Sequence, residues 1–185
     1  MRVISGDAKG RPLFFPPKSR ARPTSDMIKE AFFNILAPVT GKIFLDVFAG
    51  SGSVGIEALS RGAASVAFIE KDAAHCDYIK KNLLQCGFTE KYDIFSTEVK
   101  KAIPILQKKG VRFDIIFADP PYEAGLVEET GELFAAGKLL ASDSMIIFQH
   151  SVREEPDWKQ GWGLTVLERR KYGDTLLTFL KKIKV

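Results

Sequence analysis

Residues 43–62 read IFLDVFAGSGSVGIEALSRG, and this stretch decides the fold. It opens with a short apolar run that contains Asp46, and a Gly-x-Gly-x-x-Gly motif follows at residues 50–55. Residues 52–61 then have the composition of a helix, which Gly62 ends. A strand that leads through a glycine loop into a helix is typical of an α/β domain whose loop closely approaches a nucleoside ligand.

Outward from this stretch, short apolar segments alternate with helical ones. Strands are predicted at 65–70, 92–95, 113–118 and 145–148, and helices at 72–85, 99–108 and 126–136. This alternation predicts βαβ units in a parallel sheet that helices cover on both faces. Residues 164–172 and 175–180 flank a Gly-Asp pair and predict an antiparallel hairpin. The expected fold class is therefore α/β, a Rossmann-like sheet that is mostly parallel and ends in this hairpin.

The first part of the chain does not follow this alternation. Residues 2–5 and 13–15 predict a small hairpin, and a loop rich in proline and basic residues follows at 16–23. Thr24 is placed to cap the helix that comes next. We therefore expect a basic N-terminal extension of hairpin, loop and helix, joined to one Rossmann-like domain, with bounds 1–40 and 41–185.

The composition is that of an ordinary globular protein. Of the 185 residues, 45% are hydrophobic and 27% are charged. There is no apolar run long enough for a membrane span and no cleavable N-terminal signal, so we expect a cytoplasmic protein. The spacing of Cys76 and Cys86 favours neither a disulfide nor a zinc site. No metal is expected, and nothing in the sequence requires more than a monomer.

The net charge of +4 is unevenly distributed along the chain. Residues 1–42 have a balance of +5, residues 43–152 of −4 and residues 153–185 of +3. A basic front joined to a mildly acidic middle indicates a polyanion partner at the N-terminal part. The alternative is that these basic residues only solvate a surface.

The glycine loop and two acids point to a nucleoside cofactor. Glu70 ends the next predicted strand, where its carboxylate can accept hydrogen bonds from both hydroxyls of an adenosine ribose. Asp46 comes shortly before Gly50 and places a negative charge near the loop. A pyrophosphate would be repelled there, whereas the cationic sulfonium or ammonium of S-adenosylmethionine would be attracted. This favours the methyl donor over a dinucleotide; a structural turn or cap is the alternative for both features.

The tetrapeptide from Asp119 to Tyr122, Asp-Pro-Pro-Tyr, follows the predicted strand 113–118. Prolines remove backbone donors, so this turn offers acceptors and an aromatic ring. The Asp119 carboxylate and the Pro120 carbonyl suit the two N–H groups of an exocyclic amine, and Tyr122 suits stacking on its base. If the strands 43–48 and 113–118 are neighbours, cofactor and substrate meet in one crevice at their carboxyl ends.

Together these residues resemble the RsmD family of bacterial 16S rRNA guanine-N2 methyltransferases. The likeness covers essentially the whole chain and is most specific at residues 22–24 and 46–52. Further matches lie at residues 2–6, 9–11, 30–34, 57–63 and 119–122. The resemblance implies a class I methyltransferase that acts on 16S rRNA within an assembling small ribosomal subunit. Two positions depart from the family pattern: Lys29 stands where arginine is usual, and Glu98 where aspartate is usual.

The resemblance also assigns roles to residues. S-adenosylmethionine is expected to contact Thr24, Asp46, Phe48, Gly50, Ser51, Gly52, Glu70, Lys71 and Glu98. The catalytic group is expected to be Asp119, Pro120, Pro121 and Tyr122. RNA phosphates are expected to contact Arg2, Lys9, Arg11, Lys18, Arg20 and Arg22.

Other functions share parts of this pattern. DNA adenine-N6 methyltransferases also carry Asp-Pro-Pro-Tyr, but they usually have a sizeable target-recognition region, for which this chain has no room. Protein-glutamine methyltransferases more often begin the motif with asparagine. A nicotinamide oxidoreductase could use the glycine loop but has no need of the Asp119 turn. A non-catalytic RNA-binding assembly factor is the alternative outside enzymes.

Overall fold

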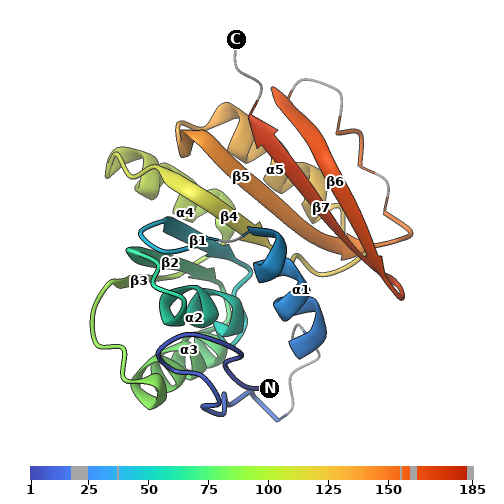
Figure 1. Cartoon of the computed structure of the whole chain (residues 1–185). Helices are drawn as coiled ribbons and strands as arrows, with labels where there is room; N and C mark the ends of the chain where they lie inside the picture. The colour runs from blue at the N-terminus through green and yellow to red at the C-terminus, as the bar shows by residue number, and fades with distance from the viewer. Residues whose placement is uncertain (18–24, 37, 155, 159–161, 183–185) are drawn as a thin grey trace.

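Seven strands form a single sheet in the computed structural model, which describes residues 1–17, 25–36, 38–154, 156–158 and 162–182 (Figure 1). The spatial order of the strands is β3-β2-β1-β4-β5-β7-β6. In chain order their bounds are β1 Ile43–Val47, β2 Ser65–Glu70, β3 Tyr92–Ser96, β4 Phe113–Ala118, β5 Leu140–Ser151, β6 Leu164–Tyr172 and β7 Thr175–Lys182. The helices are α1 Asp26–Leu36, α2 Ser53–Ser60, α3 Ala73–Cys86, α4 Val99–Lys108 and α5 Leu126–Ala136.

The pairing confirms a mostly parallel sheet with an antiparallel hairpin at its end. β1, β2, β3, β4 and β5 pair in parallel, and β7 pairs antiparallel with both β5 and β6. β1 lies between β2 and β4, so the chain first runs to one side of β1 and later returns to its other side. The outermost strand β6 has a register shift between Val166 and Glu168. The strand order therefore places a topological switch point between β1 and β4, where α/β sheets bind ligands.

Helices cover both faces of the sheet. Figure 1 shows α1, α2 and α3 on one face and α4 and α5 on the other. The first face is rich in phenylalanine, with Phe32 of α1 packed 4.9 Å from the ring of Phe117 in β4. Gly55 permits close packing of α2, because a Cβ added there would lie 2.3 Å from the ring of Phe68. The second face buries Trp158 and Trp162 against residues of α5 and β5.

The strand predicted at 145–148 is longer than expected, because β5 begins at Leu140. Its first half contains Asp143 and Ser144, which the hydrophobic pattern alone excludes from a strand. The Ser144 hydroxyl donates to the carbonyls of Phe113 (2.8 Å) and Ala141 (2.7 Å), so this buried polar side chain is satisfied inside the sheet.

The small hairpin predicted at 2–5 and 13–15 was only partly right. An isolated bridge pairs Arg2 with Pro12, and no strand forms on either side of it. The reason is that the Glu57 carboxylate in α2 accepts the backbone N–H groups of Ile4 (2.7 Å) and Ser5 (3.0 Å), which a hairpin ladder would need. Val3, Ala8 and Leu13 are nevertheless buried in the same core as α1, α2 and α3. The proposed division at residue 40 stays a prediction.

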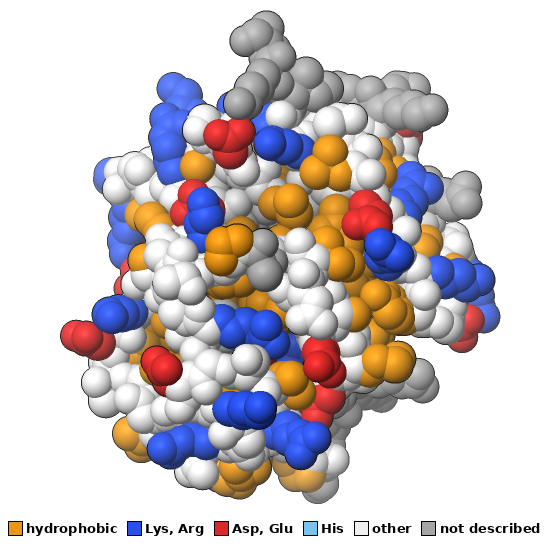
Figure 2. All heavy atoms as spheres, viewed as in Figure 1, with side chains coloured by type: hydrophobic (Ala, Val, Ile, Leu, Met, Phe, Trp, Pro, Cys, Tyr) orange, Lys and Arg blue, Asp and Glu red, His pale blue; other side chains and the backbone are white. Residues whose placement is uncertain are grey.

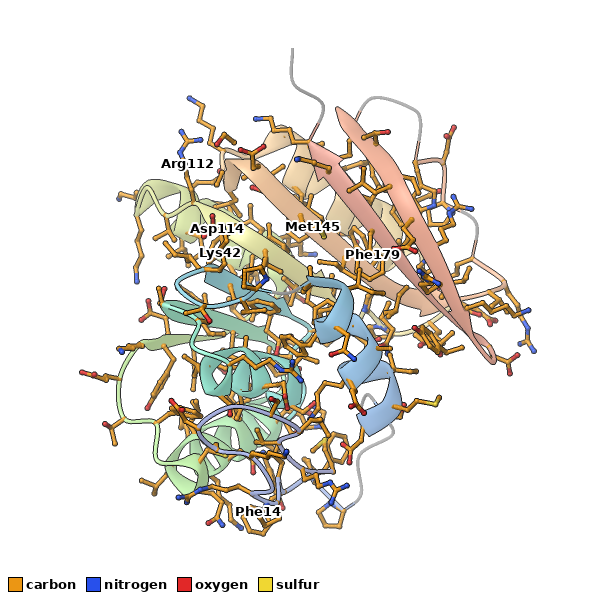
Figure 3. The ribbon with its side chains drawn as sticks, in the orientation of Figure 1. Phe14, Lys42, Arg112, Asp114, Met145 and Phe179 are labelled. Carbon is orange, nitrogen blue, oxygen red and sulfur yellow. The ribbon has the colours of Figure 1, made fainter. Side chains whose placement is uncertain are left out.

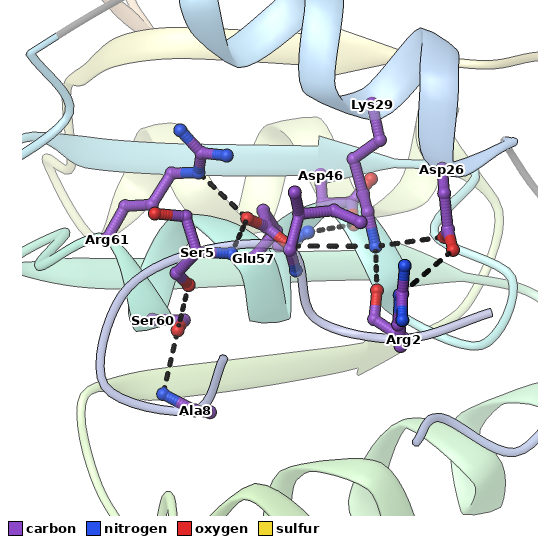
Figure 4. Close-up of polar contacts among 11 residues, drawn as sticks. Arg2, Ser5, Ala8, Asp26, Lys29, Asp46, Glu57, Ser60 and Arg61 are labelled. Carbon is purple, nitrogen blue, oxygen red and sulfur yellow. Dashed lines mark hydrogen bonds and ion pairs between the residues drawn. The ribbon is translucent and has the colours of Figure 1, made fainter. Parts of the chain in front are cut away.

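Buried charges fix this N-terminal segment, residues 1–15, to α1 and α2 (Figure 4). Lys29 of α1 is fully buried, and its Nζ donates to the Arg2 carbonyl at 2.6 Å and lies 3.6 Å from Glu57. Glu57 also accepts from Nε of Arg61 at 2.8 Å. Nζ of Lys29 also lies 4.0 Å from Oδ1 of Asp26, so this ammonium makes one hydrogen bond and two ion pairs. Burial lowers the pKa of Lys29, and the charge of Glu57 opposes this shift.

α1 begins one residue after Ser25, whose hydroxyl accepts from the N–H of Ile28 at 3.2 Å and so caps the helix. Thr24, the expected cap, lies outside the described residues, as do Lys18, Arg20 and Arg22. In the described part of the chain, no helix is long and apolar enough to cross a membrane.

Candidate active site at the carboxyl edge of the sheet

The carboxyl ends of β1 and β4 lie side by side, as the predicted site requires. Val47 pairs with Ala118 in the parallel register. The N–H of Asp119 donates to the carbonyl of Val47 at 3.3 Å, so the loop after β1 and the turn after β4 start from adjacent residues. The glycine loop and the Asp-Pro-Pro-Tyr turn therefore share one edge of the sheet.

In the loop after β1, every second residue from Phe48 to Gly52 has a positive φ. Phe48, Gly50 and Gly52 have φ values of 60°, 56° and 80°. Glycine adopts this conformation without steric cost, whereas a bulky residue such as Phe48 is strained in it. Such strain is typical of functional sites, and Phe48 lines the pocket described below.

Asp46 has a structural role, because its side chain accepts a hydrogen bond from the backbone of α2. Its buried Oδ2 accepts the N–H of Gly55 at 2.8 Å, which ties β1 to the first turn of α2. Burial raises the pKa of Asp46 well above its ordinary value; the bond from Gly55 opposes this, and the charges of Asp119 and Glu70 add to it. A cation bound nearby would favour the ionised carboxylate. The predicted contact with the cofactor stays a prediction.

Glu70 is held in one orientation by backbone donors from two loops. Its Oε2 accepts the N–H of Gly50 at 2.8 Å, and its Oε1 accepts the N–H of Asp72 at 2.9 Å. The sequence places Glu70 at the end of β2 but does not show this bridge to the glycine loop. Each carboxylate oxygen keeps a further acceptor site, so the group remains suited to ribose hydroxyls.

A pocket of about 110 Å³, partly open to solvent, adjoins these groups. Four predicted cofactor residues line it: Phe48, Glu70, Lys71 and Glu98. The sequence did not indicate the residues of α5 that form the opposite wall: Leu126, Glu129, Thr130 and Leu133. No local signal could have found them, because α5 reaches the pocket only through the tertiary packing.

Glu98 lies at the rim of this pocket, where α4 begins. Its carboxylate does not cap the helix and lies 3.5 Å from Nζ of Lys101 and 3.8 Å from Nζ of Lys100. Glu98 therefore presents a carboxylate at the pocket, and its contact with the cofactor stays a prediction.

The turn after β4 is held by a residue that the sequence did not indicate. Gln149 of β5 is buried, and its Nε2 donates to Oδ2 of Asp119 at 2.9 Å. The hydroxyl of Tyr122 lies 3.5 Å from the same nitrogen and 3.0 Å from Oγ1 of Thr175 in β7. Burial raises the pKa of the Tyr122 hydroxyl, which stays neutral, and its ring is partly exposed. Pro120 is buried, whereas Pro121 is exposed.

Three of the predicted RNA-binding residues lie in the described chain, and all are exposed: Arg2, Lys9 and Arg11. Arg2 is 3.8 Å from Asp26, and Nη1 of Arg11 donates to the carbonyl of Gln85 at 2.7 Å. Arg11 is thus partly engaged at the end of α3. Among the described residues, no group of three or more metal-ligating side chains could hold a metal ion.

The chain is similar to a known protein family and to proteins named as rRNA methyltransferases. The family model described as "Conserved hypothetical protein 95" matches residues 1–181. The chain is 35% identical over 184 residues to the "Putative rRNA methyltransferase YlbH" of Bacillus subtilis, covering 98% of this chain and 99% of that protein. It is 39% identical over 166 residues to the "Ribosomal RNA small subunit methyltransferase D" of Escherichia coli K12, covering 89% and 82% of the two chains.

Solved structures of proteins described as putative methyltransferases have a similar fold. The structure of the "Putative methyltransferase yhhF from Escherichia coli" superposes with a TM-score of 0.85 at 30% identity, covering 100% of this chain and 99% of that one. A putative methyltransferase, SMU.776, complexed with SAH superposes with a TM-score of 0.68 at 13% identity, covering 84% and 48%, which shows a shared fold alone. The glycine loop, the acidic-proline turn and these matches along almost the whole chain together show that the protein belongs to the RsmD family.

Proposed function

We propose that this protein is an S-adenosylmethionine-dependent methyltransferase that acts on the exocyclic N2 amine of a guanine in 16S rRNA during small-subunit assembly. One observation carries the proposal: the adjacent ends of β1 and β4 bring the glycine loop and the Asp119 turn to one edge of the sheet. The relatives named as rRNA methyltransferases support the choice of RNA.

The residues at this edge fit S-adenosylmethionine. Glu70, which backbone donors hold, can accept the ribose hydroxyls, and Glu98, which lines the pocket, can accept an amine from the adenine edge. Asp46 is a buried acid whose ionised form a sulfonium or ammonium would stabilise. The negative charges of a pyrophosphate would be repelled by these carboxylates. When bound, the cofactor supplies an electrophilic methyl group on a cationic sulfur.

The chain's own contribution to the reaction is orientation. The amine of guanine is a poor nucleophile because its lone pair is delocalised into the ring. Acceptance of one N–H by Asp119 and of the other by the Pro120 carbonyl holds the nitrogen with its lone pair directed at the methyl group for a direct displacement. Tyr122 stacks on the base, which must leave its helix to reach this turn. Positioning of this kind supplies most of the rate enhancement.

Gln149 and Thr175 prepare this arrangement before substrate arrives. Gln149 fixes one carboxylate oxygen of Asp119, and Thr175 holds the Tyr122 hydroxyl. The reaction releases one proton from the amine, and the acceptor is the Asp119 carboxylate or a water molecule.

The proposal is tested by incubating the protein with labelled methyl donor and, separately, naked 16S rRNA, small ribosomal subunits or DNA. Label on N2 of guanine in rRNA or subunits is the expected result. Label on adenine N6 of DNA, or RNA binding without any transfer, contradicts it. Calorimetric titration with S-adenosylmethionine and with NAD separates a methyltransferase from an oxidoreductase, because only the former is expected to bind.

A further inference from the structure

An exposed aromatic ring lies outside the candidate active site, on the N-terminal segment. Figure 3 shows Phe14 at the lower surface of the molecule, and 37% of this residue is exposed. Nζ of Lys81 in α3 lies 4.2 Å from the centre of the Phe14 ring and 5.8 Å from that of Tyr78. We call Phe14, Tyr78 and Lys81 the Phe14 platform. No role assigned above uses it.

The backbone of Phe14 is fixed by a single buried amide. Asn82 is fully buried, and its Oδ1 accepts the N–H of Phe14 at 2.7 Å while its Nδ2 donates to the Phe14 carbonyl at 2.9 Å. The same Nδ2 donates to the carbonyl of Ser51 at 2.9 Å. The ring is thus presented from a rigid backbone, at a fixed position relative to the glycine loop. A preorganised group loses little conformational entropy when it binds a partner.

The surroundings of the ring are basic. In the described part of the chain, Lys81 has no acid within ion-pair distance, whereas Lys80 pairs with Asp77 at 3.0 Å. Arg11 is anchored beside the end of α3 through its bond to Gln85. Figure 2 shows Lys and Arg side chains gathered over the lower part of the same face, with hydrophobic side chains among them. Aromatic rings interleaved with cations are the features by which proteins bind single-stranded nucleic acid.

We propose that the Phe14 platform binds an unpaired nucleobase of the RNA, other than the base that is methylated. The base stacks on Phe14, and the ammonium of Lys81 moves on its flexible stem from the ring face to the adjoining phosphate. The proposal rests on the proposed function for the identity of the polymer as RNA. Asn82 connects Phe14 to Ser51 in the glycine loop. A base bound on the platform therefore fixes which nucleotide of the RNA reaches the candidate active site.

The test measures binding of a short labelled single-stranded RNA, and of a duplex of the same sequence, by fluorescence anisotropy. Phe14→Ala is expected to weaken single-strand binding about 5- to 150-fold, since stacking of one base contributes about 1–3 kcal/mol. Phe14→Trp is expected to retain it, and duplex binding is expected to change little. Lys81→Met is expected to reduce the slope of log K against log salt by about 0.7. Ile105→Ala, at an exposed hydrophobic position of α4, is the matched control.

Unchanged single-strand binding by Phe14→Ala, or equal losses for single strand and duplex, overturns the platform. A loss seen only with whole ribosomal subunits overturns it too, because the ring would then contact a protein. Unfolding is checked separately through the thermal midpoint and S-adenosylmethionine affinity of each variant, and Phe14→Trp keeps the test valid if the alanine variant is unstable. Wild-type protein that binds the oligonucleotide through Phe14 but methylates no RNA leaves the platform standing and overturns the proposed function.

Discussion

Two carboxylates at the same edge of the sheet have different environments and therefore different expected roles. Asp119 is held by the amide of Gln149, beside an aromatic ring and two prolines. Glu70 is held by the backbone N–H groups of Gly50 and Asp72, beside the pocket. The first is suited to a substrate amine and the second to cofactor hydroxyls, so substitutions should separate catalysis from cofactor binding.

Asp119→Ala is expected to lower turnover about 10³-fold, the scale at which a positioned acid–base group contributes, with S-adenosylmethionine affinity nearly unchanged. Single-turnover methylation and calorimetry measure the two quantities. Glu70→Gln is the matched control, and it is expected to weaken cofactor binding more than it lowers the rate at saturating cofactor. An equal loss of cofactor affinity in Asp119→Ala would refute this division of roles.

Asp46 makes the stability of the cofactor-free protein depend on pH. Burial raises its pKa in the folded state, so the folded protein holds this proton more tightly than the unfolded chain. The free energy of unfolding therefore falls as pH rises through the raised pKa. Asp46→Asn keeps an oxygen acceptor for Gly55 and removes the charge, so its stability is expected to exceed that of wild type at alkaline pH and to match it in acid.

Urea denaturation across a pH series measures this difference. The same variant is expected to bind S-adenosylmethionine about tenfold more weakly, because each pKa unit of lost interaction corresponds to about 1.4 kcal/mol. Parallel stability curves for the two proteins would show that folding does not raise the pKa of Asp46.

At the scale of elements, α2 holds two parts of the molecule. Its first turn receives Asp46 from β1, and its later turns bind the N-terminal segment through Glu57 and Ser60. Ser60 Oγ accepts the N–H of Ala8 at 2.9 Å, and its carbonyl lies so close to Gly6 that a Cβ there would clash. The N-terminal segment is therefore part of the folded core and not a separate arm.

Glu57→Gln is expected to destabilise the fold by about 3–5 kcal/mol, because it leaves the buried ammonium of Lys29 without its main counter-charge. Urea unfolding followed by tryptophan fluorescence measures this loss. The double variant Glu57→Gln with Lys29→Met is expected to recover part of it, since the fully buried ammonium of Lys29 is then removed as well. Asp77→Asn, which breaks the exposed pair with Lys80, is the control and should cost less than about 1 kcal/mol.

At the scale of the whole molecule, exposed lysines and arginines form separate groups on the described surface. The exposed cations Arg2, Lys9 and Arg11 belong to the N-terminal segment, whereas the amino edge of the sheet carries Lys108, Lys109 and Lys138. If RNA lies across the N-terminal segment, only the first set should contribute to the salt dependence of binding.

Neutralising Arg2, Lys9 and Arg11 to glutamine is expected to flatten the slope of log K against log salt by about 2–3 for RNA. The matched control neutralises Lys108, Lys109 and Lys138 and is expected to leave the slope unchanged. Titrations at a series of salt concentrations measure both, and equal slopes in all three proteins would mean that the basic front is only a solvated surface.

Much of this architecture was predictable from local patterns, and the rest depends on tertiary contacts. The hydrophobic periodicity located β1, β2 and β4, and the glycine motif with Glu70 located the loop. The pattern missed the first half of β5, because its polar residues are accommodated by pairing with β4, where the carbonyl of Phe113 lies 2.8 Å from the Ser144 hydroxyl. The sequence also did not indicate Gln149 or the pocket residues of α5. The type of a glutamine or a leucine does not show which residues, distant in sequence, it will contact in the fold.

The outermost strand has a consequence for behaviour in concentrated solution. The register shift near Leu167 and the adjacent cations of β6 interrupt and charge the free side of this strand, which with β3 is one of the two edge strands in the described sheet. A second copy approaching this side would meet a mismatched spacing of donors and like charges. Intermolecular sheet growth, the usual route from a free strand to aggregates, is thereby disfavoured, because sheet growth needs matched donors and acceptors along the free edge.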